Sequence, residues 1–299
     1  MTTLPILPAF AENNVVITLQ SSDFFAPYAS VTVQSIVDNA TEENNYDIIV
    51  TTLSMTEETA KKFCSIADGR DNISVRVVNA AEIFKKYIDV NDKTYSGETI
   101  TRIMLTELLE NYDKTLNIDC DMLFCADAAE LYNQNIENMY LGAMRDLYCY
   151  LLYHSANENT YFQKKMVDYV LNMPKFLELP SIESEINGGL LLLNLKEIRK
   201  DFTIQQIADY INDKNPILFE QDTFSHFFCR RTVYLVLAWN YTTSYDSIFG
   251  KHNFYNLKTD DNYIVAFKNA SKNIKNLHYV TRIKPWQNPN VPFGTKWWN

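Results

Sequence analysis

The residues best suited to chemistry are two aspartates, Asp119 and Asp121, which follow the apolar run Thr115–Ile118. In extended chain, side chains two positions apart share a face and lie ~7 Å apart. Two carboxylates on a partly dry face repel each other by about 2 kcal/mol at an effective dielectric constant near 20. A divalent cation removes this repulsion, and hard oxygen ligands suit Mg²⁺ or Mn²⁺. The spacing therefore indicates a metal site, although aspartates also favour turns after strands.

The same spacing occurs in phosphatases of the haloacid dehalogenase type, where the first aspartate of Asp-x-Asp-x-Thr/Val attacks phosphate. In this chain position 123 is Leu, and the motif follows three predicted βα units instead of opening the chain. We therefore rank a phosphatase below a metal-binding role for the pair.

Other common sites are not visible in the sequence. The five cysteines form no Cys-x-x-Cys pair, and the four histidines show no His-Glu-x-x-His spacing. None of the seven glycines belongs to a Gly-x-Gly-x-x-Gly or P-loop pattern. If the protein binds a nucleotide, groups other than a glycine-rich loop must hold its phosphates.

The composition excludes some classes of function. The formal net charge of −10 argues against nucleic acid as a partner, because that binding relies on clustered Lys and Arg. The first twenty residues lack the basic start and long apolar stretch of a secretion signal, and no run of eighteen apolar residues occurs. We therefore expect a soluble, cytoplasmic protein.

The elements that must position the aspartates follow an α/β pattern. Short β-branched runs alternate with amphipathic stretches, which predicts a mainly parallel central sheet flanked by helices. We expect strands at 15–19, 47–53, 73–78, 115–118, 139–143 and 189–195. We expect helices at 26–37 and after a Ser54-x-x-Glu57 capping box. A third should include Ile103 and Leu108 on its buried face and leave Arg102 off that face. A fourth is expected at 161–171, and Pro174 should terminate it soon after.

The domain organisation is predicted to be simple. No internal repeat or low-complexity linker interrupts residues 1–299, so we expect a single domain. Residues 147–185 form a long excursion between two predicted core strands, and such a segment is typical of a lid or recognition element. We expect this excursion to shape a pocket for a substrate.

Several ordered segments give the chain a family resemblance. They are Ser22-Asp23-Phe24-Phe25-Ala26-Pro27-Tyr28, Thr101-Arg102-Ile103, Ile118 to Leu123, Ile186-Asn187-Gly188-Gly189 through Asn194-Leu195, Phe219-Glu220-Gln221-Asp222, His278-Tyr279 and Lys284-Pro285-Trp286. From about Val15 to Trp286 the chain resembles the bacterial members of glycosyltransferase family 8, which include lipooligosaccharide galactosyltransferases and are related to glycogenin. Together these matches are more specific than the aspartate pair alone.

The resemblance implies a GT-A fold and a retaining, metal-dependent transfer of galactose or glucose from a UDP-sugar to a glycan, glycolipid or glycoprotein. It implies that Asp119, Asp121 and His278 bind Mn²⁺ or Mg²⁺, the imidazole favouring Mn²⁺. Lys284 would meet the donor diphosphate, and Arg102 would lie between phosphate and sugar. Residues 270–299 would close over the donor.

The remaining site residues are also implied by the resemblance. Asn187 and Gln221 would contact the donor sugar, and Asp146 would reach the sugar or the acceptor. Glu220 takes a position that the family usually fills with Asp. The donor-binding residues also include Gly188 and Phe25, whose ring can stack on the base. Residue types do not identify a nucleophile, and we assign none.

Three departures from the family pattern support a second hypothesis. Ser22 and Phe24 stand where the family commonly has Asp and Asn against the nucleoside, and Thr281 replaces a Gly near the diphosphate. A catalytically weak protein that only binds a nucleotide-sugar is therefore the alternative to an enzyme.

Three tryptophans near the end of the sequence, Trp286, Trp297 and Trp298, also suggest peripheral membrane contact.

Overall fold

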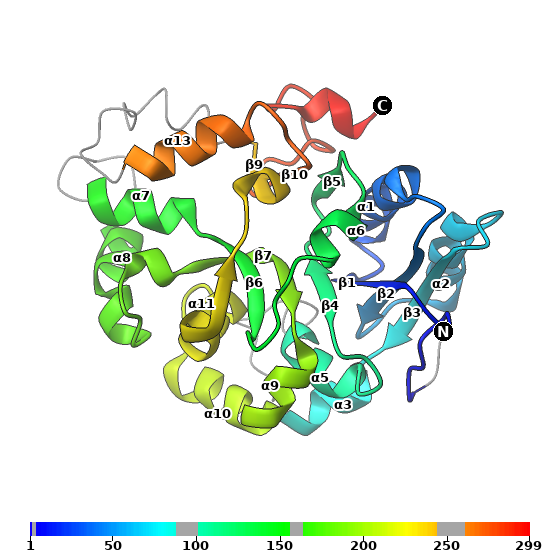
Figure 1. The fold of residues 1–299 in the computed structure, drawn as a ribbon, viewed down its shortest axis with the longest axis horizontal. Coiled ribbons are helices and arrows are strands. Elements are labelled where there is room, and N and C mark those ends of the chain that lie inside the picture. Colours follow the sequence, from blue (N-terminus) through cyan, green and yellow to red (C-terminus); the bar gives the residue numbers. More distant parts are fainter. Residues whose placement is uncertain (2–3, 88–100, 156–163, 244–260) are drawn as a thin grey trace.

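The computed structural model describes residues 1, 4–87, 101–155, 164–243 and 261–299. Its main feature is a seven-stranded sheet in the order β3-β2-β1-β4-β7-β6-β8 (Figure 1). The strands are β1 (Asn14–Gln20), β2 (Asn45–Thr52), β3 (Ile73–Asn79), β4 (Thr115–Ile118), β6 (Leu141–Arg145), β7 (Ile186–Leu193) and β8 (Thr232–Tyr234). Only β7 runs antiparallel to its neighbours β4 and β6, so the sheet is mainly parallel, as predicted.

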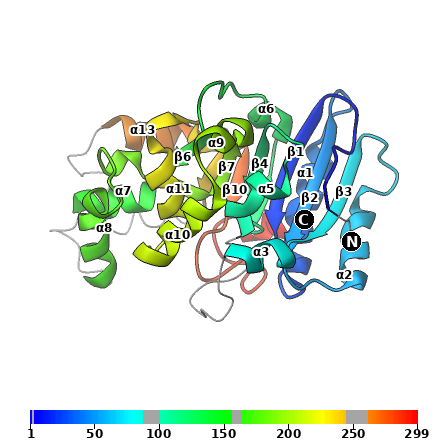
Figure 2. The ribbon, with the colours of Figure 1, turned by 90° about the horizontal axis from the view of Figure 1, so that it is seen from below.

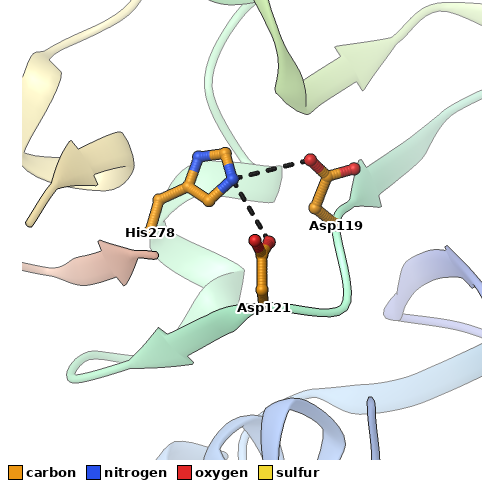
Figure 3. A group of neighbouring side chains, drawn as sticks. All are labelled: Asp119, Asp121 and His278. Carbon is orange, nitrogen blue, oxygen red and sulfur yellow. Dashed lines mark ion pairs between the residues drawn. The ribbon is translucent and has the colours of Figure 1, made fainter. Parts of the chain in front are cut away.

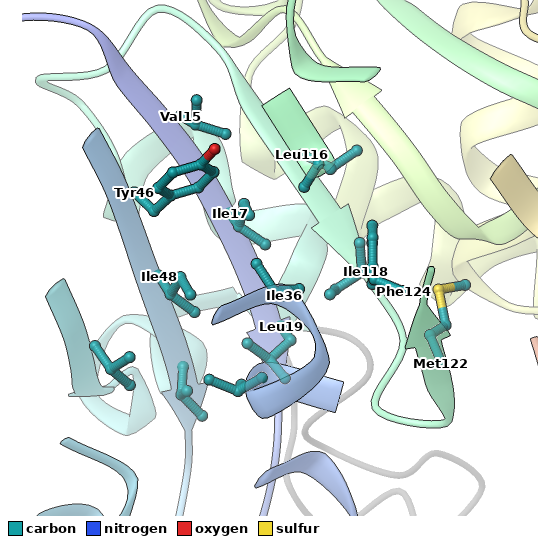
Figure 4. Packing of buried hydrophobic residues seen from close by; sticks show 14 of the residues in the cluster. Val15, Ile17, Leu19, Ile36, Tyr46, Ile48, Leu116, Ile118, Met122 and Phe124 are labelled. Carbon is teal, nitrogen blue, oxygen red and sulfur yellow. The ribbon is translucent and has the colours of Figure 1, made fainter. Parts of the chain in front are cut away.

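Both faces of the sheet are covered, which explains why its central strands are apolar throughout. Alternate residues of β1, Val15, Ile17 and Leu19, pack with Ile36 of α1 (Ala26–Asn39) and with α2 (Glu57–Cys64) on one face (Figure 4). Val16 points to the other face. The helices on that second face are α3 (Ala81–Tyr87), α5 (Leu105–Leu108), α9 (Leu195–Asp201), α10 (Ile204–Lys214) and α11 (Glu220–Phe228).

A second, three-stranded sheet was not predicted from the sequence. It consists of β5 (Met122–Phe124), β10 (Asn276–His278) and β9 (Tyr241–Thr242), with β10 antiparallel to β5 and parallel to β9. These strands have only two or three residues each, too few to show a periodic pattern. The pairing joins the C-terminal part of the chain to the loop that follows β4.

The other helices lie mostly at one end of the molecule. Helices α7 (Leu147–Ser155), α8 (Lys164–Phe176) and α13 (Asp261–Ala270) gather at the end opposite α2 and β3 (Figures 1 and 2). They share a third apolar cluster with β9 and β10. The remaining elements are α6 (Ala128–Tyr132) and the 3-10 helices η1 (Ser65–Ala67), η2 (Thr101–Met104), η3 (Ile182–Ser184), η4 (Cys229–Arg231), η5 (Leu237–Asn240) and η7 (Gly294–Trp297).

Several local predictions were wrong. The N-cap of α2 is Thr56, whose hydroxyl accepts the Thr59 N–H at 3.3 Å, so Ser54 and Glu57 form no capping box. Pro174 lies inside α8, which continues to Phe176. Strand β6 begins two residues later than predicted, whereas β7 begins three residues earlier and ends before Leu195. Helix α7 was missed, and residues 161–163 of the predicted helix 161–171 lie outside the described residues.

The predicted orientation of Arg102 was also wrong. The expected amphipathic helix is a turn of 3-10 helix, η2, followed by the short α5, and this change of helical period turns Arg102 inward. Arg102 is only 3% exposed. Its charge is therefore buried beside the end of β4.

In the part of the chain that the structure describes, no helix combines the length and the apolar character needed to span a bilayer.

A buried ion pair links β2 to β3 and provides a test of the fold. Asp47 is fully buried and accepts hydrogen bonds from Arg76 Nη2 at 2.6 Å and Tyr112 Oη at 2.8 Å. Asp47→Ala leaves the Arg76 charge unpaired, and we expect the free energy of unfolding to fall by about 3 kcal/mol in urea denaturation. Lys62→Ala, which breaks an exposed pair with Glu58, should leave it almost unchanged. Equal effects of both changes would contradict this view of the sheet.

Candidate active site

Three ligand-type side chains converge where the two sheets meet. His278 Nε2 lies 3.5 Å from Asp119 Oδ2 and 3.3 Å from Asp121 Oδ1 (Figure 3). One donor atom from each residue falls within 4.8 Å of the other two. The structure therefore brings together the three residues that the sequence analysis assigned to a metal.

The backbone of both sheets positions this triad. Asp119 follows β4, and its N–H donates to Gly189 O of β7 at 2.8 Å. His278 pairs with Met122 across the β10–β5 ladder, which places the imidazole beside Asp121. The hydroxyl of Thr32, on α1, lies 2.9 Å from Cys120 O and so holds the loop between Asp119 and Asp121.

A chain of hydrogen bonds sets the tautomer of His278. The Gly189 N–H can only donate, so the Asn187 atom 3.1 Å away is its carbonyl oxygen, which also accepts Asn240 Nδ2 at 2.7 Å. Asn240 Oδ1 therefore faces His278 Nδ1, at 2.7 Å, and receives its proton. When the imidazole is neutral, Nε2 carries the free lone pair and points at the two aspartates.

The small size of Gly189 makes this convergence feasible. A Cβ at this position would overlap His278 Cε1 and lie 2.9 Å from Asp119 Oδ2. Any larger residue would push the imidazole or the carboxylate out of place. The glycine is required here for close approach of side chains.

The electrostatics of the triad also favour a cation. Burial alone lowers the pKa of His278, but the nearby carboxylates of Asp121 and Asp119 outweigh it and raise this pKa to about 9. Burial opposes ionisation of Asp119, yet Arg102 and His278 hold its pKa well below the usual range. Both carboxylates are therefore ionised at neutral pH.

The donor set fits a divalent metal on its own chemistry. His278 Nε2 and Asp121 Oδ1 are buried and have no hydrogen-bond partner among the described residues. Two carboxylates and one imidazole suit Mn²⁺ or Mg²⁺, and the nitrogen ligand favours Mn²⁺. A metal bound here would satisfy both orphaned atoms.

A cavity of about 350 Å³ opens beside the triad. It is lined by Gln20, Ser21, Ser22, Phe25, Arg102, Ile118, Asp119, Cys120, Asp121, Glu220, Lys284 and Trp286. Of these, Phe25, Arg102, Asp119, Asp121, Glu220 and Lys284 were predicted site residues, whereas Gln20, Ser21 and Cys120 were not assigned a role and Trp286 was connected only with membrane contact. The cavity wall thus combines three acidic side chains, two cations and the aromatic rings of Phe25 and Trp286.

Two cations flank the carboxylates. Arg102 forms a close ion pair with Asp119, donates to Gly188 O at 2.5 Å, and lies 3.4 Å from Glu220 Oε1. Burial raises the pKa of Glu220 to about 7, and the charge of Arg102 opposes this rise. On the other side, Lys284 Nζ lies 2.6 Å from Asp121 Oδ2.

A second cluster of polar side chains lies next to the triad and is connected to it through β7. Gln221 Oε1 accepts the Gly188 N–H at 2.9 Å, and Asn187 Nδ2 donates to Asp146 Oδ2 at 2.9 Å. Asp146 follows β6 and its other oxygen accepts the Cys149 N–H at the start of α7. Every residue predicted for the site therefore lies in the triad, in the cavity wall or in this adjoining network.

Sequence reasoning missed four residues of the network. Asn240 orients His278, Glu185 accepts from Gln221, and Tyr169 of α8 makes a close hydrogen bond to Asp222, which follows Gln221. Asp222 belonged to a recognised segment but received no role. The other three stand in no motif, and only the fold places them at the site.

Comparison with known proteins gives a consistent result. The model of the family Glycosyl transferase family 8 matches residues 16–289. A Haemophilus influenzae protein named "Putative glycosyltransferase" is 27% identical over 207 residues, which are 69% of this chain and 56% of that protein. The chain thus spans about half the length of this relative.

Solved structures share the fold. The bifunctional glycosyltransferase WbbM superposes with a TM-score of 0.82 at 22% identity, over 98% of this chain and 50% of that one. The galactosyltransferase LgtC, solved with donor and acceptor sugar analogs, gives 0.69 at 20% identity, over 94% and 93%. GlyE of Streptococcus pneumoniae gives 0.63 at 14%, over 95% and 60%. The fold is therefore of the GT-A type.

The steric argument about Gly189 predicts a selective defect. Gly189→Ala should weaken Mn²⁺ binding by roughly 10- to 100-fold, because its methyl group displaces a ligand. Isothermal titration calorimetry of the full chain with MnCl₂ measures this loss. Gly142→Ala is the matched control, since its Cβ would meet only the ends of two apolar side chains, Leu235 at 3.1 Å and Ile136 at 3.3 Å, and no residue of the triad. Wild-type Mn²⁺ affinity in Gly189→Ala would contradict the assignment of the triad.

Proposed function

The chain belongs to glycosyltransferase family 8, and on that premise we propose that it is a metal-dependent hexosyltransferase using a UDP-sugar. The sugar would be galactose or glucose, transferred with retention of its anomeric configuration to a glycan, glycolipid or glycoprotein. The observation that carries the proposal is the Asp119–Asp121–His278 triad at the wall of a 350 Å³ cavity that also holds Arg102 and Lys284. These groups match the charge of a nucleoside diphosphate bound through a cation.

In this proposal Asp119, Asp121 and His278 would hold the metal. When bound, it supplies Lewis-acid stabilisation for the negative charge that develops on the leaving diphosphate. The protein adds its own fixed charges. Lys284 lines the cavity, and its ammonium group donates to Asp121 Oδ2 and to Tyr279 O at 2.6 Å each, which leaves its third N–H for a phosphate oxygen. Buried Arg102 keeps Asp119 ionised and oriented.

The sugar would sit where β7 meets α11. Asn187 and Gln221 present amide groups there, and Asp146 anchors both, at 2.9 Å from Asn187 Nδ2 and 3.5 Å from Gln221 Nε2. Their mutual hydrogen bonds hold these side chains in place before substrate arrives, which reduces the entropy lost on binding. Glu220, next to Gln221, faces the cavity and pairs with Arg102 instead of a substrate hydroxyl.

The nucleoside would lie at the other end of the cavity. Ser22 and Phe25 line that end, and the Phe25 side chain is 41% exposed, so its ring is accessible for stacking on a base. Gln20 and Ser21 add neutral polar groups. We propose uridine as the nucleoside that binds there.

The structure bears on the alternative of a weak binding protein. Of the three departures, only Ser22 lines the cavity among the described residues. Phe24 is 75% exposed, and the Thr281 hydroxyl donates to Ile283 O at 2.9 Å. The metal triad and both cations are intact, so we favour the enzyme.

The acceptor side is proposed from position alone. The described parts of residues 147–185 form α7, α8 and η3, and Tyr169 of α8 contacts Asp222 beside Gln221. These helices are placed to shape an acceptor pocket. Peripheral membrane contact also stays a prediction, with Ile283 and Trp298 among the exposed apolar residues of the C-terminal segment. A cytoplasmic location stays a prediction too.

A donor panel tests the proposal. Calorimetric binding and hydrolysis of UDP-galactose, UDP-glucose and other UDP-sugars are measured with MnCl₂ and with EDTA. We expect binding and slow release of UDP for one sugar with Mn²⁺ only. Binding without turnover would favour the alternative, and no binding with either addition would refute a UDP-sugar donor.

Loss of one ligand sharpens this test. Asp121→Ala should weaken Mn²⁺-dependent donor binding by at least about 100-fold while leaving the fold intact, because only two of the three protein ligands would remain to hold the cation. Asp168→Ala, which removes a carboxylate paired with Lys164 on exposed α8, is the matched control. Unchanged donor affinity in Asp121→Ala would exclude this residue as a ligand.

A further inference from the structure

Glu185 is a buried acid that none of the proposed steps uses. It immediately precedes β7, is 0% exposed and contacts Gln221, one of the proposed sugar-binding residues. Its Oε1 accepts Gln221 Nε2 at 3.0 Å. Its Oε2 is buried with no hydrogen-bond partner among the described residues. Such a group requires an explanation, because an unpaired buried carboxylate is costly.

The groups that face Glu185 offer no positive charge. They are Asp222 of α11, Asp146 before α7, Cys149 of α7, Tyr169 of α8, Tyr210 of α10 and Cys229 of η4. Arg145 of β6 pairs with the neighbouring Ile186, but its guanidinium lies over the Tyr234 ring. The polar partners of Glu185, Gln221 and Ser225, are neutral. No Lys or Arg of the described ranges forms an ion pair with it. Burial and the nearby acids raise the pKa of Glu185 well above its ordinary value.

The position of Glu185 connects it to the candidate sugar site. Gly188 N–H can only donate, so Gln221 Oε1 must face it and Gln221 Nε2 must face Glu185. Gly188 O in turn accepts from Arg102. A displacement of Gln221 would therefore shift the strand that carries the donor-binding residues.

We propose that Glu185 is a positioning residue that works as an uncharged carboxylic acid, its carbonyl oxygen fixing the Gln221 amide toward the donor sugar. This inference rests on the proposed function of Gln221. In the neutral form Oε1 accepts one hydrogen bond and Oε2 carries the proton. An ionised Glu185 would add a buried negative charge beside the carboxyl groups of Asp146 and Asp222.

The neutral form makes a specific prediction for two variants of the full chain. Glu185→Gln keeps the carbonyl acceptor and the shape, so turnover of the donor that the UDP-sugar panel identifies should stay at the wild-type value. Glu185→Ala frees the Gln221 amide, and kcat should fall by roughly 100-fold, the loss expected for a misplacement of about 1 Å, with donor affinity preserved. If Glu185→Gln loses as much kcat as Glu185→Ala, Glu185 acts as a carboxylate and the proposal is wrong.

A stability measurement decides the protonation state without turnover. A carboxyl whose pKa is higher in the folded than in the unfolded protein makes the folded state bind more protons, so stability falls as pH rises between the two values. As the pH rises above the ordinary pKa of a glutamate toward the raised pKa of Glu185, Glu185→Gln should therefore gain stability relative to wild type in urea denaturation. Acids that do not interact with Glu185 contribute equally to both proteins and cancel in the difference, so the gain reports the proton that Glu185 holds next to Asp222.

Glu183→Gln is the matched control. Glu183 lies two residues away with a 37% exposed side chain beside His154, and its substitution should show no such gain with pH. A constant difference between Glu185→Gln and wild type across this range would overturn the proposal. If wild type turns over no donor in the panel, the proposed function fails, yet the stability difference still decides whether Glu185 is neutral.

Discussion

The mutual repulsion of Asp119 and Asp121 is the constraint on which the rest of the site depends. Both side chains are ionised within a partly enclosed space, and the protein surrounds them with Arg102, Lys284 and His278. Each of these three positive or protonatable groups comes from a different segment. The fold must therefore bring η2, β10 and the C-terminal region to one loop, and the second sheet exists at that meeting point.

Much of this framework follows from the sequence because the large sheet obeys simple rules. Strands β1, β2 and β4 are buried on both faces along most of their length, so they contain mainly apolar and β-branched residues and end near polar ones. Parallel strands place their carboxyl ends at one edge, which is where Asp119 lies. The family resemblance then supplied residues far from that edge, and the structure brings them to it.

The rest was not predictable, for physical reasons. Arg102 appeared to belong to a solvent-facing position because helical periodicity was assumed, whereas a 3-10 turn shifts the face that it occupies. The strands of the small sheet owe their stability to pairing partners distant in sequence, and two or three residues carry no period of their own. Asn240 and Glu185 matter through what they touch. No spacing within the sequence marks such contacts.

The Asn187-Gly188-Gly189 segment of β7 explains how a metal site and a sugar site share one structure. Gly189 accepts the Asp119 N–H and packs against His278, while Gly188 binds Gln221 through its N–H and Arg102 through its carbonyl. Two adjacent residues thus contact both halves of the site through backbone atoms. A side chain at Gly189 would separate the metal ligands, and a Cβ at Gly188 would lie 3.1 Å from Gln221 Cβ. The close spacing of the two halves therefore depends on a strand that has no side chains at the point where they meet.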